Sequence, residues 1–106
     1  MKIDKLSKMV NGWFIGDFEP TAFASKDFEV CYRTHKEAEK WATHYHKKSV
    51  EINVLIDGIM TIQDKTLLPG DIFTLHPWEI ADPVFVTDCT VLTVKTPSVG
   101  NDKYEI

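Results

Sequence analysis

Short runs of alternating apolar and polar residues, separated by turn-forming residues, make up most of this chain. Residues 28–33 (Phe-Glu-Val-Cys-Tyr-Arg) alternate as a half-buried strand does, since successive side chains of a strand point to opposite faces. Runs rich in Val, Ile, Leu, Phe and Thr predict further strands at 51–56, 59–62, 72–75, 83–86 and 90–95. A spacing of about 8–12 residues between short strands is typical of an all-β sandwich or barrel.

Turn signals divide these runs from one another. Asp57-Gly58, between two β-rich runs, is the strongest hairpin signal in the chain. Gln63-Asp64-Lys65 predicts a polar turn, and Pro69-Gly70-Asp71 predicts another before the strand at 72–75. Only residues 36–41 are compatible with a helix, and they are too few for a stable one, so a polar loop is an equally good interpretation. The sequence therefore predicts an all-β protein.

The strand at 51–56 carries two different faces. Glu51, Asn53 and Leu55 share one face, which is polar near its start, and the other face is entirely aliphatic. Because the aliphatic face also has to be covered, we expect both sides of this strand to be buried. Such a strand suits a barrel wall that lines a pocket.

Length and composition describe one ordinary globular domain. The 106 residues can bury a core without disulfides, and we expect an N-terminal arm with the first strands at 1–27, a barrel core at 28–96 and a tail at 97–106. The net charge is −4 with no basic block, so nothing supports a nucleic acid or an anionic membrane surface as a partner. The chain has neither a signal-peptide pattern nor a stretch of about 20 apolar residues, so we expect a cytoplasmic protein.

Two further features bear on the state of the protein. Cys31 and Cys89 form no C-x-x-C pair, and we expect them to be reduced and partly buried rather than disulfide-bonded or catalytic. Residues 12–16 (Gly-Trp-Phe-Ile-Gly) concentrate apolar bulk that so small a domain can rarely cover alone. We therefore expect a homodimer.

The candidate chemistry begins with two histidines one residue apart. His44 and His46 lie two positions apart on a predicted strand, so their imidazoles project to the same face, while Tyr45 points to the opposite face. Glu51 follows across a short bend. Two imidazoles and a carboxylate on one interior wall can hold a metal ion or a small polar ligand.

The spacing of these residues resembles the cupin superfamily of small jelly-roll β-barrels. His44, His46, Glu51 and Gly58 fit the first cupin motif, although its leading glycine is replaced by Ala38. Pro69-Gly70-Asp71, the strand at 72–75 and Pro77 fit the second motif, so the resemblance covers roughly residues 28 to 96. It implies an all-β fold, a cupin-type jelly-roll β-barrel or sandwich.

One position departs from the cupin pattern. The resemblance implies a fourth metal ligand, a histidine, at the position of Ala81, and alanine cannot bind a metal. By strand alternation Glu79 shares a face with that position, whereas Asp82 would reach it only through a bulge. His76 occupies a rim position. The alternative interpretation is that Glu79 and Asp82 are surface carboxylates.

The resemblance implies a site assembled from three groups of residues. His44, His46 and Glu51 would hold a divalent Fe, Mn, Ni or Zn ion. The carboxylates of Glu51 and Glu79 would take part in catalysis. The ligand would contact Tyr32, Asn53, His76 and Trp78, and Trp41 would either join Trp78 at the mouth or pack the barrel end.

Three functions are compatible with this site. The first is a metal-dependent enzyme acting on a small polar molecule, such as a dioxygenase, isomerase or lyase. The second is a metal-free module that binds or senses a small ligand, for instance a sugar or nucleotide sugar, as the loss of the ligand at position 81 suggests. The third is a purely structural β-sandwich dimer with vestigial histidines. Folds of this kind host many functions, so the sequence does not name the substrate.

Overall fold

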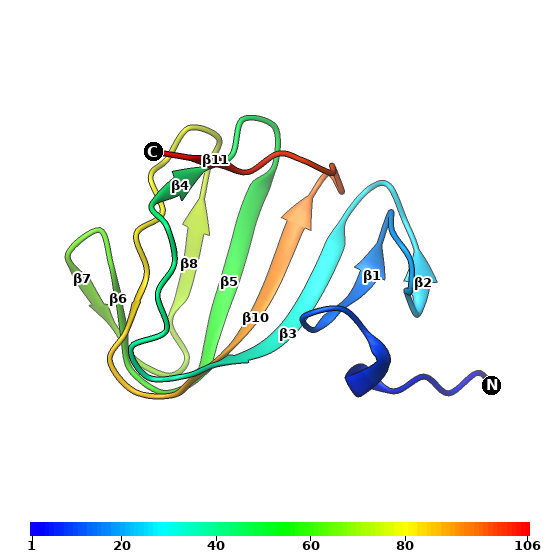
Figure 1. Cartoon of the computed structure of the whole chain (residues 1–106), viewed down its shortest axis with the longest axis horizontal. Coiled ribbons are helices and arrows are strands. Elements are labelled where there is room, and N and C mark those ends of the chain that lie inside the picture. The colour runs from blue at the N-terminus through cyan, green and yellow to red at the C-terminus, as the bar shows by residue number, and fades with distance from the viewer.

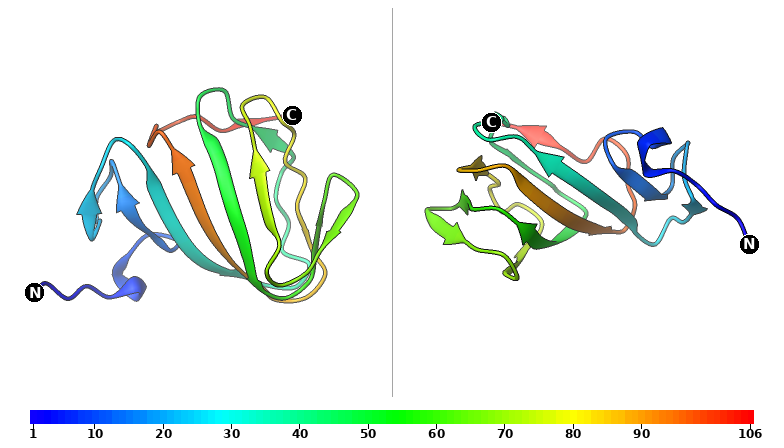
Figure 2. Two further views of the ribbon diagram at one scale, coloured as in Figure 1. Left: turned by 180° about the vertical axis from the view of Figure 1, so that it is seen from behind. Right: turned by 90° about the horizontal axis from the view of Figure 1, so that it is seen from below.

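Two β-layers face each other in the computed structural model, which describes residues 1–106 (Figures 1 and 2). The only helical element is a short 3₁₀ helix, η1 (Leu6–Lys8), and no helix is long and apolar enough to cross a membrane. The strands are β1 (Trp13–Gly16), β2 (Phe23–Ala24), β3 (Glu29–His35), β4 (His44–Tyr45), β5 (Val50–Asp57), β6 (Met60–Ile62), β7 (Lys65–Leu67), β8 (Ile72–Leu75), β9 (Val84–Phe85), β10 (Cys89–Thr96) and β11 (Tyr104–Glu105).

The larger layer is a six-stranded sheet in the order β2-β1-β3-β10-β5-β8. Its centre is β10, which pairs antiparallel with β3 on one side and with β5 on the other. This pairing places Val91 opposite Arg33 and Leu55, and Thr93 opposite Cys31 and Asn53. Side chains at odd-numbered positions of β3, β5 and β10 consequently point to the same, inner face of the sheet.

The second layer is built from short strands that cross this inner face. One sheet has the order β7-β6-β9, another pairs β11 with β4, and a β-bridge joins His44 to Ala81. Its buried side chains complete two hydrophobic clusters with those of the large sheet: Leu55, Met60, Phe85, Cys89 and Val91 in one, and Ile62, Leu75 and Ala81 in the other. These clusters fill one end of the space between the layers and hold the layers together.

The predicted hairpin at Asp57-Gly58 is wrong. β5 pairs with β10 and β8, whereas β6 pairs with β7 and β9, so this turn carries the chain from one layer to the other. The crossing is tight because a Cβ atom at Gly58, whose φ is 95°, would lie 2.2 Å from the carbonyl oxygen of Asp88. Glycine is needed here for a layer crossing rather than for a hairpin.

The hairpin in this region forms one turn later. Gln63 and Asp64 have φ angles of 49° and 60°, and they connect the antiparallel strands β6 and β7. The predicted strands at 28–33, 51–56, 72–75, 83–86 and 90–95 are confirmed as β3, β5, β8, β9 and β10. Residues 36–41 form a loop, as the second interpretation of that segment had it.

The expectation that both faces of the strand at 51–56 are buried is only half met. Its inner residues Asn53 and Leu55 are 3% and 0% exposed, but Ile52 and Ile56 on the outer face are 38% and 44% exposed. No element of the chain covers the outer face of the large sheet over these residues. A single chain therefore buries one side of this strand fully and the other only in part.

Candidate functional site

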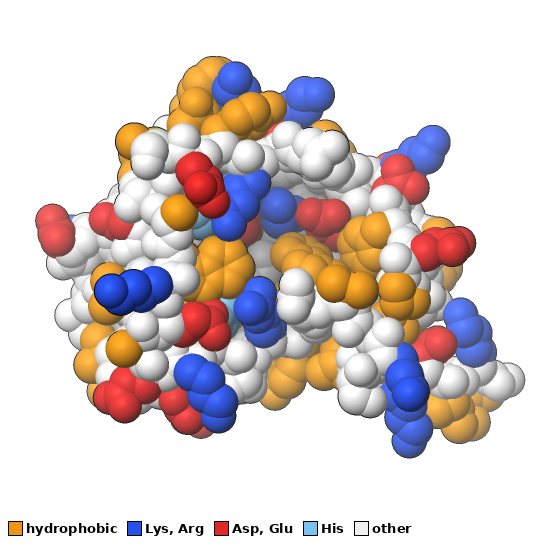
Figure 3. Space-filling model, in the orientation of Figure 1, with side chains coloured by type: hydrophobic (Ala, Val, Ile, Leu, Met, Phe, Trp, Pro, Cys, Tyr) orange, Lys and Arg blue, Asp and Glu red, His pale blue; other side chains and the backbone are white.

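A cavity of about 630 Å³ lies between the two layers and opens on the face shown in Figure 3. In that view the hollow has charged side chains at depth and hydrophobic side chains around its rim. Its walls come from inward residues of β3, β5 and β10 on one side and from β4, β6 and β9 on the other. A cavity of this size can enclose a small organic molecule.

His44 and His46 project into this cavity side by side, as strand alternation predicted. Their rings meet edge to face with centroids 5.3 Å apart, and the residues are 6% and 5% exposed. The Nδ1 atom of His44 lies 2.9 Å from the carbonyl oxygen of Ala42, which assigns the proton to Nδ1 and leaves Nε2 as an acceptor toward the cavity. The ring nitrogens of His46 make no hydrogen bond with the protein.

The His46 imidazole is disposed to stay neutral at pH 7. Burial lowers its pKa, the nearby Lys95 ammonium lowers it further, and the Glu51 carboxylate only partly opposes these effects. A neutral imidazole offers one donor and one acceptor. His46 can therefore both donate to and accept from a ligand in the cavity.

A hydrogen-bonded row of side chains orients Glu51 on the opposite wall. The Thr93 hydroxyl donates to Oδ1 of Asn53 at 2.7 Å, and Nδ2 of Asn53 donates to Oε2 of Glu51 at 3.2 Å. Asn53 is held further by a 3.4 Å bond from Nδ2 to the carbonyl oxygen of Phe73. Oε1 of Glu51 has no protein partner, so it is available to accept a hydrogen bond from a ligand.

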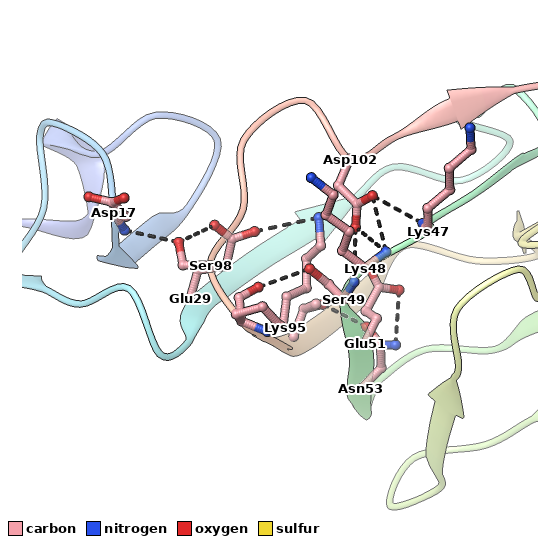
Figure 4. A network of polar contacts seen from close by, with 12 residues as sticks. Asp17, Glu29, Lys47, Lys48, Ser49, Glu51, Asn53, Lys95, Ser98 and Asp102 are labelled. Atoms are coloured by element: carbon pink, nitrogen blue, oxygen red, sulfur yellow. Dashed lines mark hydrogen bonds and ion pairs between the residues drawn. The ribbon is translucent and has the colours of Figure 1, made fainter.

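Lys95 adds a cation to the same wall. Its Nζ lies 3.5 Å from Oε1 of Glu29 and 5.6 Å from the centroid of Trp13. The other carboxylate oxygen of Glu29 accepts a hydrogen bond from the Ser98 hydroxyl at 2.9 Å, and that hydroxyl accepts one from the backbone N–H of Asp17 at 3.0 Å (Figure 4). This chain of contacts fixes the ammonium beside the histidine pair.

These residues do not assemble the metal site that the sequence predicted. No group of three or more His, Cys, Asp or Glu side chains in the chain is arranged to hold a metal ion. His44 and His46 lie together, Asn53 holds one oxygen of Glu51, and Ala81 is bridged to the backbone of His44. The Lys95 ammonium beside His46 also disfavours a second cation at this position. As placed, the three predicted ligands are not gathered around one point, and metal binding at His44, His46 and Glu51 stays a prediction.

Four of the residues predicted to contact a ligand or act in catalysis lie outside the cavity. Tyr32 is on the outer face of β3 and is 41% exposed. Trp78 is 63% exposed and stacks on Tyr45 with ring centroids 5.5 Å apart. His76 and Glu79 form a turn in which the backbone N–H of His76 donates to Oε1 of Glu79 at 3.0 Å. The alternation assumed for residues 76–81 fails because this segment is a loop.

The surface interpretation holds for both carboxylates of that segment. Backbone hydrogen bonding from His76 lowers the pKa of Glu79, and Oδ1 of Asp82 accepts a 2.7 Å bond from the backbone of Gln63. Neither side chain lines the cavity. The cysteines also behave as expected, since both are free and buried. Burial raises the pKa of Cys31 to about 11, although Arg33 opposes the shift.

The structure adds cavity residues that the sequence interpretation had not assigned. Glu29, Arg33, Thr93 and Lys95 all line the cavity. Each occupies the same strand parity as the buried Cys31 or Val91, so strand alternation carried the signal. It did not single them out, because charged residues on a predicted strand are usually assigned to the solvent face.

The C-terminal residues 98–106, here called the C-terminal strap, run from the end of β10 to β4 (Figure 1). The strap is held by Asp102, whose carboxylate accepts backbone hydrogen bonds of 2.9–3.2 Å from Lys47, Lys48 and Ser49 (Figure 4). β11 then pairs with β4, the strand that carries His44, and places Glu105 opposite His44. Strap residues 99–103 thereby become part of the cavity wall.

Comparisons with solved structures identify the architecture. A double-stranded β-helix protein from Klebsiella pneumoniae superposes with a TM-score of 0.68 at 16% identity, covering 76% of this chain and 71% of that one. An RmlC-like cupin from Shewanella frigidimarina superposes with a TM-score of 0.63 at 15% identity, covering 72% of this chain and 71% of that one. A DMSP lyase from Ruegeria pomeroyi superposes with a TM-score of 0.68 at 17% identity, covering 88% of this chain and 49% of that one.

No family model matches the sequence, and no curated protein is similar to it. At these identities the likeness concerns the fold. One local feature agrees with it: Ala38, at the position of the leading glycine in the first cupin motif, has a φ of 60°, in the left-handed region that glycine favours. The arrangement of the two layers around a histidine-bearing cavity, together with these neighbours, shows that the chain has the cupin fold.

Proposed function

We propose that this protein binds a small hydroxyl-bearing molecule directly through the side chains of its cavity, without a metal ion. The observation that carries the proposal is a set of polar atoms that are open to the cavity and lack protein partners. They are the ring nitrogens of His46, Nε2 of His44 and Oε1 of Glu51.

These atoms are accessible from the cavity and make no hydrogen bond with the protein, so their partners come from what the cavity holds. The set contains acceptors and one donor but no gathered metal ligands. Hydroxyl groups both donate and accept, so they match such a set better than a purely apolar or purely cationic molecule does. A neutral sugar or another polyol has the right chemistry.

The metal-dependent enzyme remains the competing proposal, favoured by the adjacency of the two histidines. One fold neighbour is a lyase by its name, and proteins of one fold host different activities. For this chain, a third donor would have to approach His44 and His46. Glu51 is the candidate, because its Oε1 is free while Asn53 holds Oε2.

Binding can be tested by thermal shift and calorimetry against hexoses, sugar nucleotides and carboxylic acids in the presence of EDTA. A ligand at 100 times its Kd stabilises the fold by about 2.7 kcal/mol, which raises the melting temperature by several degrees. Asn53→Leu keeps the volume but removes the bonds that orient Glu51, and it should weaken binding at least about tenfold. Tyr32→Phe changes the outer face of the same sheet and is the matched control, expected to bind as the wild type does.

Two results would overturn the proposal. One is a thermal shift that appears only after Fe(II), Mn(II), Ni(II) or Zn(II) is added and that is lost in the His44→Ala, His46→Ala double variant. The other is ligand binding that Asn53→Leu leaves unchanged, because the ligand would then sit elsewhere.

A further inference from the structure

One cation of the cavity has no partner in the protein. Arg33, the only arginine of the chain, lies on β3 with its side chain in the cavity wall. The ion pairs of the chain involve lysines and His35, and none involves Arg33. Its guanidinium also makes no hydrogen bond with the protein, so five N–H donors remain available to whatever enters the cavity.

A second unpaired cation lies against the same aromatic ring. The guanidinium carbon of Arg33 is 5.1 Å from the centroid of Trp41, and Nζ of Lys103 is 4.5 Å from it. Lys103 belongs to the C-terminal strap, so two distant segments bring like charges to one place. Cation–π contacts hold each charge over the indole but do not neutralise it.

The carboxylate beside this ring is already engaged. Oε2 of Glu39 accepts hydrogen bonds of 2.7 Å from Nε1 of Trp41 and from Nδ1 of His35. These hydrogen bonds orient the indole, and Glu39 forms no ion pair with Arg33 or Lys103. The Trp41 end of the cavity thus gathers two cations beside one carboxylate, so its net charge is positive.

The four acidic residues of the lining are held by other contacts or lie on an exposed loop. Glu29 is paired with Lys95, Asp102 is bound by backbone amides, and one oxygen of Glu51 is held by an amide side chain. The fourth, Glu19, lies on an exposed loop between β1 and β2. None forms an ion pair with Arg33 or Lys103.

From this juxtaposition we infer that the cavity has an oxyanion subsite, in which Arg33 and Lys103 bind a carboxylate or phosphate group of the ligand. The fork of the guanidinium matches either group in a bidentate manner, and the lysine adds a point charge. The inference rests on the proposed function and extends it: the ligand is a hydroxylated molecule that also carries an acidic group, such as a sugar acid or a sugar phosphate.

The test uses the full chain, three probes and a single reporter. Because the chain has one arginine, its Nε–Hε group gives one resonance in a heteronuclear NMR spectrum of the labelled protein. Titration with glucose 6-phosphate and with gluconate, each in EDTA, distinguishes phosphate from carboxylate, and glucose is the neutral probe. We expect at least one anionic probe to shift this resonance saturably and to bind at least about tenfold more tightly than glucose.

Variants separate charge recognition from general packing. Arg33→Met should weaken binding of the anionic probe about 10- to 100-fold and change glucose binding less than about twofold. Lys103→Met should have a smaller effect in the same sense. Lys47→Met removes the same charge outside the cavity, where Nζ of Lys47 lies 4.2 Å from the ring of Tyr104, and should leave all three affinities unchanged.

Each contrary outcome refutes a defined statement. If glucose binds as tightly as both anions, or if Arg33→Met weakens all probes equally, the oxyanion subsite is wrong and the proposed function stands. If the anions bind more tightly but only when a divalent metal is added, the metal-free function is wrong and the subsite stands. If none of the three probes binds, both are overturned.

Discussion

The anchor of the C-terminal strap provides the most direct test of how this cavity is closed. Oδ1 of Asp102 accepts bonds from the backbone N–H groups of Lys47 and Lys48 at 3.0 and 3.2 Å, and Oδ2 accepts from those of Lys48 and Ser49 at 3.0 and 2.9 Å. In Asp102→Asn one oxygen becomes an NH₂ group that cannot accept. Lys48 keeps a partner, but the N–H of either Lys47 or Ser49 loses its own.

The size of the effect follows from these bonds. Ser49 is 1% exposed, so a backbone N–H that loses its partner there cannot form a hydrogen bond with water instead. Such an unpaired N–H costs about 1–3 kcal/mol, and the remaining bonds weaken when the acceptor loses its charge, so we expect a loss of about 2–4 kcal/mol of unfolding free energy. Asp82→Asn is the matched control, since its exposed carboxylate accepts one backbone bond, and we expect it to cost less than about 1 kcal/mol.

The loss should also depend on pH. Burial raises the pKa of the Asp102 carboxyl, but the hydrogen bonds from Ser49, Lys47 and Lys48 outweigh burial and hold its pKa below the usual value. Its contribution is therefore complete above the unfolded pKa of about 3.9 and disappears as the pH falls through the folded pKa. The difference between wild type and Asp102→Asn should vanish in acid.

Urea unfolding followed by tryptophan fluorescence measures the unfolding free energy of the whole domain. Hydrogen exchange over residues 98–106 measures the local opening of the strap. We expect faster exchange at Ile106, whose N–H now donates to Thr43 at 3.0 Å. Equal stability and equal exchange in Asp102→Asn and Asp82→Asn would refute the role of Asp102 as the anchor.

Three further predictions concern residues outside the ligand contacts. Ala38→Gly should stabilise the fold by about 0.5–1 kcal/mol in urea, because glycine relieves the φ of 60° at a smaller entropic cost, and a loss of stability would contradict this. With a pKa of about 11, Cys31 should be alkylated by iodoacetamide at pH 8 at a rate roughly a hundredfold below that of the urea-unfolded chain, and equal rates would contradict its burial. Light scattering should give twice the chain mass of 12.1 kDa, because Ile52, Ile56 and Ile72 are 38%, 44% and 67% exposed on the outer sheet face. Ile72→Lys should shift the protein toward monomer, and a monomeric wild type would contradict the homodimer.

The sequence determined the longer strands at 28–33, 51–56, 72–75 and 90–95, and which side chains of a strand share a face. Alternation along β4 and β5 placed His44, His46, Glu51 and Asn53 in the cavity and turned Tyr45 out of it, and the structure agrees. Such predictions succeed because the geometry of a strand is local: each side chain points opposite to its neighbour whatever the strand pairs with. The spacing of the same residues was sufficient to predict the cupin fold.

Tertiary structure decided which segments meet. Asp57-Gly58 has the local chemistry of a hairpin, yet it crosses between layers, because pairing with β8 and β10 outweighs a local turn preference. Residues 76–81 form a loop rather than a strand, so alternation gave no valid placement for Trp78 or Glu79. The neighbours of the charged residues could not be predicted either. Strand register places Lys95 opposite Glu29 and Glu51, where its charge acts on His46. The C-terminal strap brings Lys103 to the Trp41 ring beside Arg33.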